Sequence, residues 1–128
     1  MKKRIIVTGG SGRFGSCLKD IVTKHKIFFP TKKIFNILNV DSMRKYLRKI
    51  NANVVIHLAG LSRPMSIHER NINKSIELNI IGTANVTKVC SELNVKLIYF
   101  STNYVYPGVK GNYSEHDNLF PVNNYAWS

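Results

Sequence analysis

Apolar and polar positions follow two alternating rhythms along the chain, and these predict strands and helices in turn. Continuous apolar runs predict strands at residues 4–8, 26–30, 53–58 and 96–100, and a shorter run predicts one at 34–37. Helical spacing predicts helices at 14–25, at 41–50 with Asp41 or Ser42 as the cap, at about 66–93, and starting within 122–128. This alternation indicates an α/β fold with a doubly wound parallel sheet, which binds ligands at the carboxyl ends of its strands.

Each predicted helix carries an apolar stripe that we expect to face the core. The stripes are Phe14, Cys17, Leu18, Ile21 and Val22 in the first helix; Met43, Tyr46, Leu47 and Ile50 in the second; and Ile76, Ile80, Thr83, Ala84, Thr87, Val86, Val89, Cys90 and Leu93 in the third. Neither cysteine belongs to a CxxC pair or a His/Cys cluster. We therefore expect Cys17 and Cys90 to be buried structural thiols rather than metal ligands or disulfide partners.

A glycine-rich turn follows the first strand directly, at Gly9-Gly10-Ser11-Gly12-Arg13-Phe14-Gly15. The glycines fit GxxGxxG when counted from Gly9 and GxGxxG when counted from Gly10, and both spacings are dinucleotide fingerprints. Glycine lets the backbone approach a pyrophosphate closely, and a helix N-terminus favours an anion. The alternative is an ordinary strand-to-helix turn with glycine caps. The position of the glycine-rich turn between an apolar strand and a helix favours a dinucleotide site in a Rossmann-type fold.

Small and polar residues follow two further predicted strands, at Ala59-Gly60 and at Ser101-Thr102. Because parallel strands end at the same rim, these segments and the glycine turn form one candidate site. His57 ends a buried strand, so we expect it to pack near the cofactor rather than to act as a catalyst.

Five segments, in chain order, resemble those of the extended short-chain dehydrogenases/reductases, which act largely on nucleotide sugars and bind NAD or NADP. They are Thr8–Gly15 (TGxxGxxG), His57–Gly60 (HxAA/G), Asn79–Asn85 (NxxGTxN), Ser101–Gly108, and Tyr113–Asp117 with Pro121–Ala126. The fourth is close to the STDYVFxG segment of the dTDP-4-dehydrorhamnose reductase branch, with Asn103 in place of aspartate. The resemblance covers nearly the whole chain and selects the frame of Gly9, Gly12 and Gly15.

The resemblance implies a role for individual residues. Thr102 and Tyr125 would be catalytic, with the tyrosine as acid and base on the sugar oxygen and the threonine hydroxyl steadying that oxygen. Ser101, Asn103 and Tyr104 would contact the substrate. The cofactor would be bound by Gly9, Ser11, Gly12, Arg13, Phe14, Gly15, Asn36, Ile37, Leu58, Ala59, Gly60 and Asn79. No metal site is implied.

In this family a lysine four residues after the tyrosine, one helical turn along, stabilises the phenolate. Here that lysine would be the residue after Ser128. We therefore expect the chain by itself to be a poor catalyst. We also expect its sheet to be incomplete at the C-terminal side and its substrate-binding lobe to be absent.

The end of the second strand predicts the choice of cofactor. A site that prefers NAD places Asp or Glu about 20 residues after the glycines to hold the ribose hydroxyls. Here the region reads Phe29-Pro30-Thr31-Lys32-Lys33, which contains no acid. The two lysines, together with Arg13 in the glycine turn, favour the 2′-phosphate of NADP, with NAD as the alternative.

The composition and charge of the chain indicate which kinds of partner it binds. The 128 residues are 44% apolar and 20% charged, which is typical of one globular domain, and we assign residues 1–128 to it. The net charge of +12 would attract polyanions, but the basic residues are spread evenly and no nucleic-acid-binding motif is present. No apolar run reaches the ~20 residues that span a bilayer, and the N-terminus does not resemble a signal peptide. We expect a cytoplasmic protein with a nucleotide-sugar substrate, no nucleic-acid or membrane partner, and the capacity to form a homo-oligomer.

The sequence thus predicts the NADP-binding domain of a nucleotide-sugar oxidoreductase whose intact form reduces a 4-keto deoxysugar nucleotide. One alternative is an epimerase or dehydratase of the same family, although Asn103-Tyr104 stands where a dehydratase usually has Asp-Glu. Another alternative is a non-catalytic dinucleotide-binding or regulatory fragment.

Overall fold

A single parallel sheet of four strands forms the centre of the computed structural model, which describes residues 1–128. The strands are β1 (Arg4–Thr8), β2 (Lys26–Phe28), β3 (Val54–His57) and β4 (Lys96–Tyr99), in the order β2-β1-β3-β4. Ile6 of β1 pairs with Phe28 on one side and with Val55 on the other. The strand order therefore reverses beside β1, which creates the switch point where sheets of this kind bind ligands. The predicted α/β fold is confirmed.

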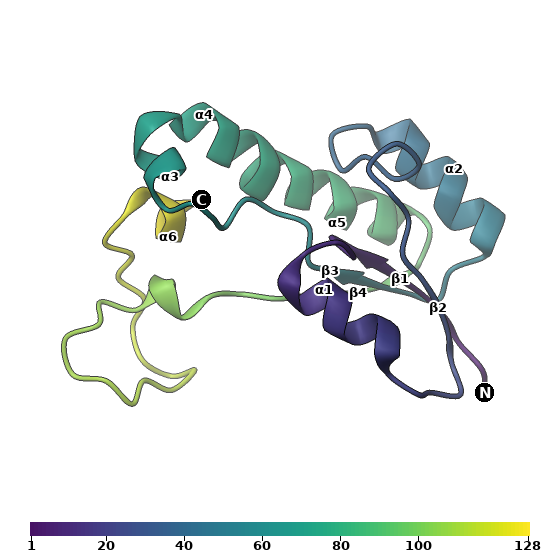
Figure 1. Ribbon diagram of the computed structural model, residues 1–128, viewed down its shortest axis with the longest axis horizontal. Helices are drawn as coiled ribbons and strands as arrows, with labels where there is room; N and C mark the ends of the chain where they lie inside the picture. The colour runs from purple at the N-terminus through teal and green to yellow at the C-terminus, as the bar shows by residue number, and fades with distance from the viewer.

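The helices lie on both faces of this sheet and beyond the ends of its strands. They are α1 (Arg13–Cys17), continued by η1 (Leu18–Asp20); α2 (Val40–Ile50); α3 (Ser66–Arg70); α4 (Ile72–Ser75), continued by the π-helical η2 (Ile76–Ile81) and by α5 (Gly82–Glu92); η3 (Asn103–Val105); and α6 (Asn124–Trp127). Figure 1 shows α2 and α5 on one face of the sheet and α1 on the other. It also shows α3 and α6 together at the far end, beyond the carboxyl ends of the strands.

The hydrophobic core lies between the sheet and the pair α2 and α5. Its buried side chains are Ile6 and Val55 from the strands, Met43 and Leu47 from α2, Val86, Val89 and Cys90 from α5, and Phe35, Ile37 and Ala52 from the connections. The predicted cap of the second helix, Asp41 or Ser42, is wrong: the cap is Asn39, whose side chain accepts the Ser42 N–H at 2.9 Å, and the helix begins at Val40. Its predicted apolar face is correct, since Met43 and Leu47 are buried and Tyr46 and Ile50 pack against the core.

The predicted strand at residues 34–37 is wrong, because this segment forms a turn. The side chain of Asn36 accepts the N–H of Leu38 at 3.0 Å, a local hydrogen bond that competes with strand pairing. The turn presses Phe35 and Ile37 into the core, where they are 5% and 8% exposed. The apolar residues Phe35 and Ile37 therefore indicate side chains that are buried in the core, not a strand.

The predicted helix at 14–25 is too long, since the helical turns end at Asp20 and Ile21 is extended. The β-branched residues Ile21, Val22 and Thr23 disfavour a helix, and no core covers them: Ile21 is 53% and Val22 99% exposed. The expectation that both cysteines are buried is only half correct. Cys90 is buried but Cys17 is exposed.

The predicted helix at 66–93 is interrupted at Asn71, which leaves helical geometry with φ −146° and caps α4 by accepting the Lys74 N–H at 3.2 Å. The C-terminal half of the predicted stripe is buried as expected, at Val86, Val89 and Cys90. Its N-terminal half is wrong, because Ile76 and Ile80 are exposed. None of the helices in this fold combines the length and the apolar character needed to cross a bilayer.

Candidate functional site

The turn after β1 has the conformation that its glycines permit. Gly9 has a φ of +67°, and a Cβ atom on it would lie 2.8 Å from the backbone nitrogen of Ala59. A Cβ on Gly15 would collide with the carbonyl oxygen of Gly9. The N–H of Gly12 donates to that same oxygen at 2.9 Å, and no side chain caps α1. The structural demands at Gly9 and Gly15 match the frame of Gly9, Gly12 and Gly15.

Two pockets adjoin this turn at the carboxyl ends of the strands. The glycine-side pocket, of about 380 Å³, is lined by Thr8, Gly9, Gly10, Ser11, Lys19, Phe29, Pro30, Thr31, Lys32, Phe35, Asn36, Ile37, Ala59, Gly60 and Leu78. The tyrosine-side pocket, of about 400 Å³, is lined by Phe14, His57, Leu58, Ala59, Gly60, Leu61, Ser62, Asn79, Thr83, Tyr99, Phe100, Ser101, Thr102, Val105, Tyr125, Ala126 and Ser128. Ala59 and Gly60 belong to both, so one short wall of backbone separates the two pockets.

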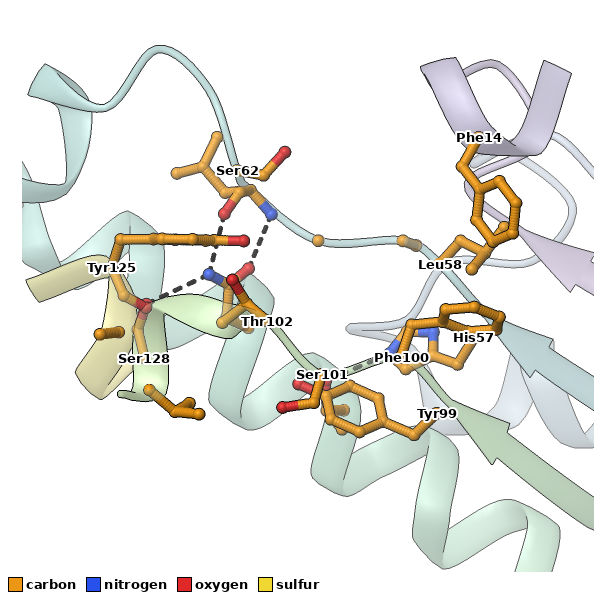
Figure 2. A pocket seen from close by; sticks show the side chains of 17 residues that line it. Phe14, His57, Leu58, Ser62, Tyr99, Phe100, Ser101, Thr102, Tyr125 and Ser128 are labelled. Carbon is orange, nitrogen blue, oxygen red and sulfur yellow. Dashed lines mark hydrogen bonds between the residues drawn. The ribbon is translucent and has the colours of Figure 1, made fainter. Parts of the chain in front are cut away.

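Most of the residues predicted for the site reach these pockets. Gly9, Ser11, Asn36 and Ile37 line the glycine-side pocket, Phe14, Leu58 and Asn79 line the tyrosine-side pocket, and Ala59 and Gly60 line both. Ser101, Thr102 and Tyr125 come together in the tyrosine-side pocket (Figure 2). Gly12, Arg13 and Gly15 line neither pocket, and neither do Asn103 and Tyr104. Tyr104 instead packs edge-on against Tyr125, with ring centroids 5.3 Å apart.

Two lining residues that the sequence did not bring into the site are Lys19 and Thr83. Lys19 lies in η1 and lines the glycine-side pocket, where its Nζ is 5.9 Å from the ring centroid of Phe29. Thr83 lies inside the recognised segment Asn79–Asn85, four residues after Asn79, and Lys19 stands four residues after Gly15. Helical spacing from Asn79 and Gly15 was therefore the signal that could have assigned both to the site.

A buried chain of hydrogen bonds holds the wall between the pockets. The hydroxyl oxygen of Thr8 accepts the N–H groups of Leu58 and Ala59, at 3.1 and 3.0 Å. With both lone pairs occupied, this hydroxyl donates its proton to Nδ1 of His57 at 2.8 Å. Nε2 of His57 must then carry the ring proton, which it donates to the Thr83 hydroxyl at 3.1 Å.

His57 is therefore a neutral structural group. It is 1% exposed, and burial lowers its pKa from 6.5 to about 4. At neutral pH the ring carries no charge, and both its nitrogens are engaged with threonine hydroxyls. The geometry agrees with the expectation of a packed histidine beside the site.

Asn79, in the π-helical segment η2, supports the other end of the same wall. Its Oδ1 accepts the Leu61 N–H at 2.6 Å and its Nδ2 donates to the Leu61 carbonyl at 2.9 Å. Both polar atoms of this side chain are thus engaged by the loop that follows β3. Nδ2 of Asn79 also donates to Oγ of Ser128 at 3.2 Å, so Asn79 links that loop to the residue that follows α6.

The tyrosine-side pocket has an aromatic end and a hydroxyl end. Figure 2 shows Phe14 and Phe100 with His57 at one end, and Tyr125 with Thr102 at the other. The Phe14 and Phe100 rings meet edge-on, with centroids 5.0 Å apart. No acidic side chain lines either pocket, and the glycine-side pocket carries two lysines. This pair of pockets suits an extended anionic ligand that runs from the lysines across the shared wall toward the hydroxyl groups.

The sheet order, the glycine turn at the switch point and the adjoining pockets define a Rossmann-type nucleotide-binding domain. The model of the RmlD substrate binding domain family matches residues 2–128, and the chain belongs to this family.

Curated and solved relatives agree with this assignment. The chain is 30% identical to dTDP-4-dehydrorhamnose reductase from Mycolicibacterium smegmatis, over 98% of this chain and 39% of that protein. It is 27% identical to methionine adenosyltransferase 2 subunit beta from Danio rerio, over 98% of this chain and 41% of that protein. The crystal structure of dTDP-4-dehydrorhamnose reductase from Bacillus anthracis in complex with NADP superimposes with a TM-score of 0.92 at 29% identity, covering 99% of this chain and 46% of the other. The chain thus spans about 40% of the length of the curated relatives it matches.

Proposed function

We propose that this chain is the NADP-binding part of a sugar-nucleotide reductase that reduces the keto group of a 4-keto deoxysugar nucleotide such as dTDP-4-dehydrorhamnose. The observation that carries the proposal is the shared wall at Ala59 and Gly60. It places a glycine turn with lysines on one side and the pair Thr102 and Tyr125 on the other. The named reductase relatives, one of them solved with NADP, support the same assignment.

The residues of the glycine-side pocket fit the cofactor. A side chain at Gly9 would fill the space next to the wall, and the absence of acids removes repulsion of a 2′-phosphate. Lys19 and Lys32 would hold that phosphate from two different segments of the chain. When bound, NADPH supplies a hydride. We retain the sequence-based expectations of a cytoplasmic location and of homo-oligomer formation as predictions.

Thr102 and Tyr125 would handle the oxygen of the reacting carbonyl. As the carbonyl carbon gains the hydride, its oxygen becomes an alkoxide that needs a proton and a hydrogen-bond donor. Tyr125 would give its phenolic proton to this oxygen, and the Thr102 hydroxyl would hold it by a hydrogen bond. Ser101, in the same pocket, would bind the sugar hydroxyls.

A second candidate function is a nucleotide-binding subunit in an assembly. It is favoured by the match to methionine adenosyltransferase 2 subunit beta, a protein named as a subunit, over the same region of the chain. The two candidates share the glycine-side pocket and differ in the use of Tyr125. Only a reductase requires the phenolic proton.

Nucleotide titration tests the cofactor assignment. We expect NADPH to bind more tightly than NADH in titrations that are monitored by nucleotide fluorescence. Lys32→Gln should weaken NADPH binding about tenfold, while the affinity for NADH stays within about twofold. Lys33→Gln is the matched control, because Lys33 is exposed and lines neither pocket. Tighter binding of NADH would contradict the choice of NADP, and an equal effect of the two substitutions would contradict the role given to Lys32.

Turnover tests the reductase assignment. With dTDP-4-dehydrorhamnose and NADPH we expect a slow loss of NADPH absorbance, because the chain by itself is expected to be a poor catalyst, and Tyr125→Phe should abolish most of this residual turnover. Tyr46→Phe serves as the control, since Tyr46 lies on α2 and packs against Phe35 in the core. A residual turnover that Tyr125→Phe leaves unchanged would contradict the role given to Tyr125 and favour the subunit function instead.

A further inference from the structure

We propose that helix α3 is the element that positions Tyr125, and that His68 is its positioning residue. This inference rests on the proposed function, because that function gives the Tyr125 hydroxyl its role in proton transfer. It concerns a part of the chain that lies outside both pockets: neither His68 nor Glu69 of α3 lines them.

His68 is a fully buried polar ring with one unused nitrogen. It has 0% exposure, and its Nε2 has no hydrogen-bond partner. Burying a polar side chain costs free energy unless it makes hydrogen bonds, so an imidazole at a place where an apolar side chain would pack calls for a reason. Its immediate neighbour supplies one. The His68 and Tyr125 rings lie with centroids 4.8 Å apart.

A directed chain of hydrogen bonds links His68 to the backbone of Tyr125. The Ser128 hydroxyl donates its single proton to the Tyr125 carbonyl at 3.1 Å, so in its 2.6 Å contact with Ser75 it must accept. Ser75 therefore donates to Ser128 and accepts from Nδ1 of His68, also at 2.6 Å. The ring proton of His68 lies on Nδ1, which leaves Nε2 as a lone pair rather than an orphaned N–H.

The next residue of α3 holds the start of α6. Glu69 Oε2 accepts from Nδ2 of Asn124 at 2.7 Å, and Oε1 accepts the Asn124 N–H at 3.3 Å. Two consecutive residues of α3 thus fix α6 at its beginning and, through Ser75 and Ser128, at its end.

This support acts on the helix that carries Tyr125, since none of the side chains of α6 is buried. The Tyr125 ring is held between His68 and the edge-on ring of Tyr104. The side chain shares the hydroxyl end of the pocket with Thr102 (Figure 2). The direction of the phenol is therefore set by α3 on one side and by Tyr104 of η3 on the other.

The experiment follows Tyr125 by ¹⁹F NMR in protein that contains 3-fluorotyrosine. The chain has 6 tyrosines, and the signal lost in Tyr125→Phe assigns the one of interest. We expect His68→Leu, which keeps the volume but not the donor, to move this signal toward its position in the unfolded chain. His68→Asn, which restores an N–H donor near Nδ1, should recover a large part of the shift. Arg70→Gln, at an exposed position on the same helix, should leave the signal in place.

Circular dichroism establishes that each variant is folded, and Ser75→Ala provides a second test if His68→Leu unfolds the chain. Ser75→Ala removes the link to Ser128 without touching the ring, and it should move the Tyr125 signal in the same direction. The inference is overturned if the signal stays unmoved in a folded His68→Leu or Ser75→Ala protein, or if His68→Asn recovers nothing. NADPH affinity, measured on the same samples, should stay within about twofold of the wild type. A wild-type protein that binds no NADPH overturns the proposed function through a readout that is separate from the ¹⁹F signal.

Discussion

Replacing Thr8 by valine removes one hydroxyl on which three polar groups depend. The N–H groups of Leu58 and Ala59 and the Nδ1 atom of His57 all lose their partner at 2.8–3.1 Å, while the shape of the side chain is kept. A buried polar group without a partner costs about 1–3 kcal/mol. Leu58 and Ala59 are only half-buried, so water in the pockets can replace part of the loss. We therefore expect the free energy of unfolding to fall by about 2–4 kcal/mol.

Urea denaturation followed by circular dichroism measures this change, and thermal unfolding should show a fall in Tm of about 6–15 °C for a chain of this size. Thr87→Val is the matched control, because Thr87 is exposed on α5 and its hydroxyl only donates to the carbonyl of Thr83 at 2.9 Å. The control should change stability by less than about 0.5 kcal/mol. Equal stabilities of the two variants would refute the role we give to the Thr8 hydroxyl.

The double variant Thr8→Val with His57→Leu tests whether the two residues act as one unit. Removing the imidazole first takes away one of the three groups that Thr8 serves. The double variant should therefore be more stable than the sum of the single effects predicts, by about 1 kcal/mol. Strict additivity would mean that the Thr8–His57 hydrogen bond contributes nothing.

Three further predictions follow from burial. The pKa of His57 is lowered from 6.5 to about 4, so at pH values between these two the unfolded chain binds more protons than the folded chain. The free energy of unfolding, measured by urea titration, should therefore rise by about 3 kcal/mol from pH 4 to 6.5, and His57→Gln should remove this rise. A thiol reagent should modify only the exposed Cys17 in the native protein and reach Cys90, whose pKa burial raises to about 11, only on unfolding; modification of a second thiol in the native wild type, or of Cys90 in native Cys17→Ser protein, would contradict this. Met43→Ala should cost about 2–5 kcal/mol in urea, since Met43 is fully buried against Leu47 and the sheet, and a loss below about 1 kcal/mol would contradict its place in the core.

The sequence predicted the elements whose pattern has a single physical cause. The strands β1 and β3 are continuous apolar runs, because both faces of a parallel sheet are covered, and their bounds were nearly correct. Phe35 and Ile37 are apolar for a different reason, since they are buried in the core from a turn that the Asn36 side chain stabilises. Apolar spacing alone cannot separate these two causes.

The composition of the site was predictable, but its internal supports were not. Glycines, small residues and hydroxyl groups at strand ends pointed to the rim of the sheet, and the two pockets lie there. The pairing of Thr8 with His57 joins residues 49 positions apart, and the direction of its hydrogen bonds depends on which lone pairs are already occupied. A linear pattern carries no information of that kind. The same holds for His68 and Ser75, which sit seven residues apart across a break in the helix at Asn71.

The segment Leu58–Leu61, which includes the wall at Ala59 and Gly60, connects the two pockets structurally. Its backbone touches Gly9, is held by the Thr8 hydroxyl at Leu58 and Ala59, and is fixed again by Asn79 at Leu61. A ligand in the glycine-side pocket therefore lies against Ala59 and Gly60, which also line the tyrosine-side pocket. Because each of these supports is a buried or half-buried hydrogen bond, the wall has little freedom to move alone. Substitutions at Thr8 should consequently weaken nucleotide binding and disturb Tyr125 together, although Thr8 lines only the glycine-side pocket.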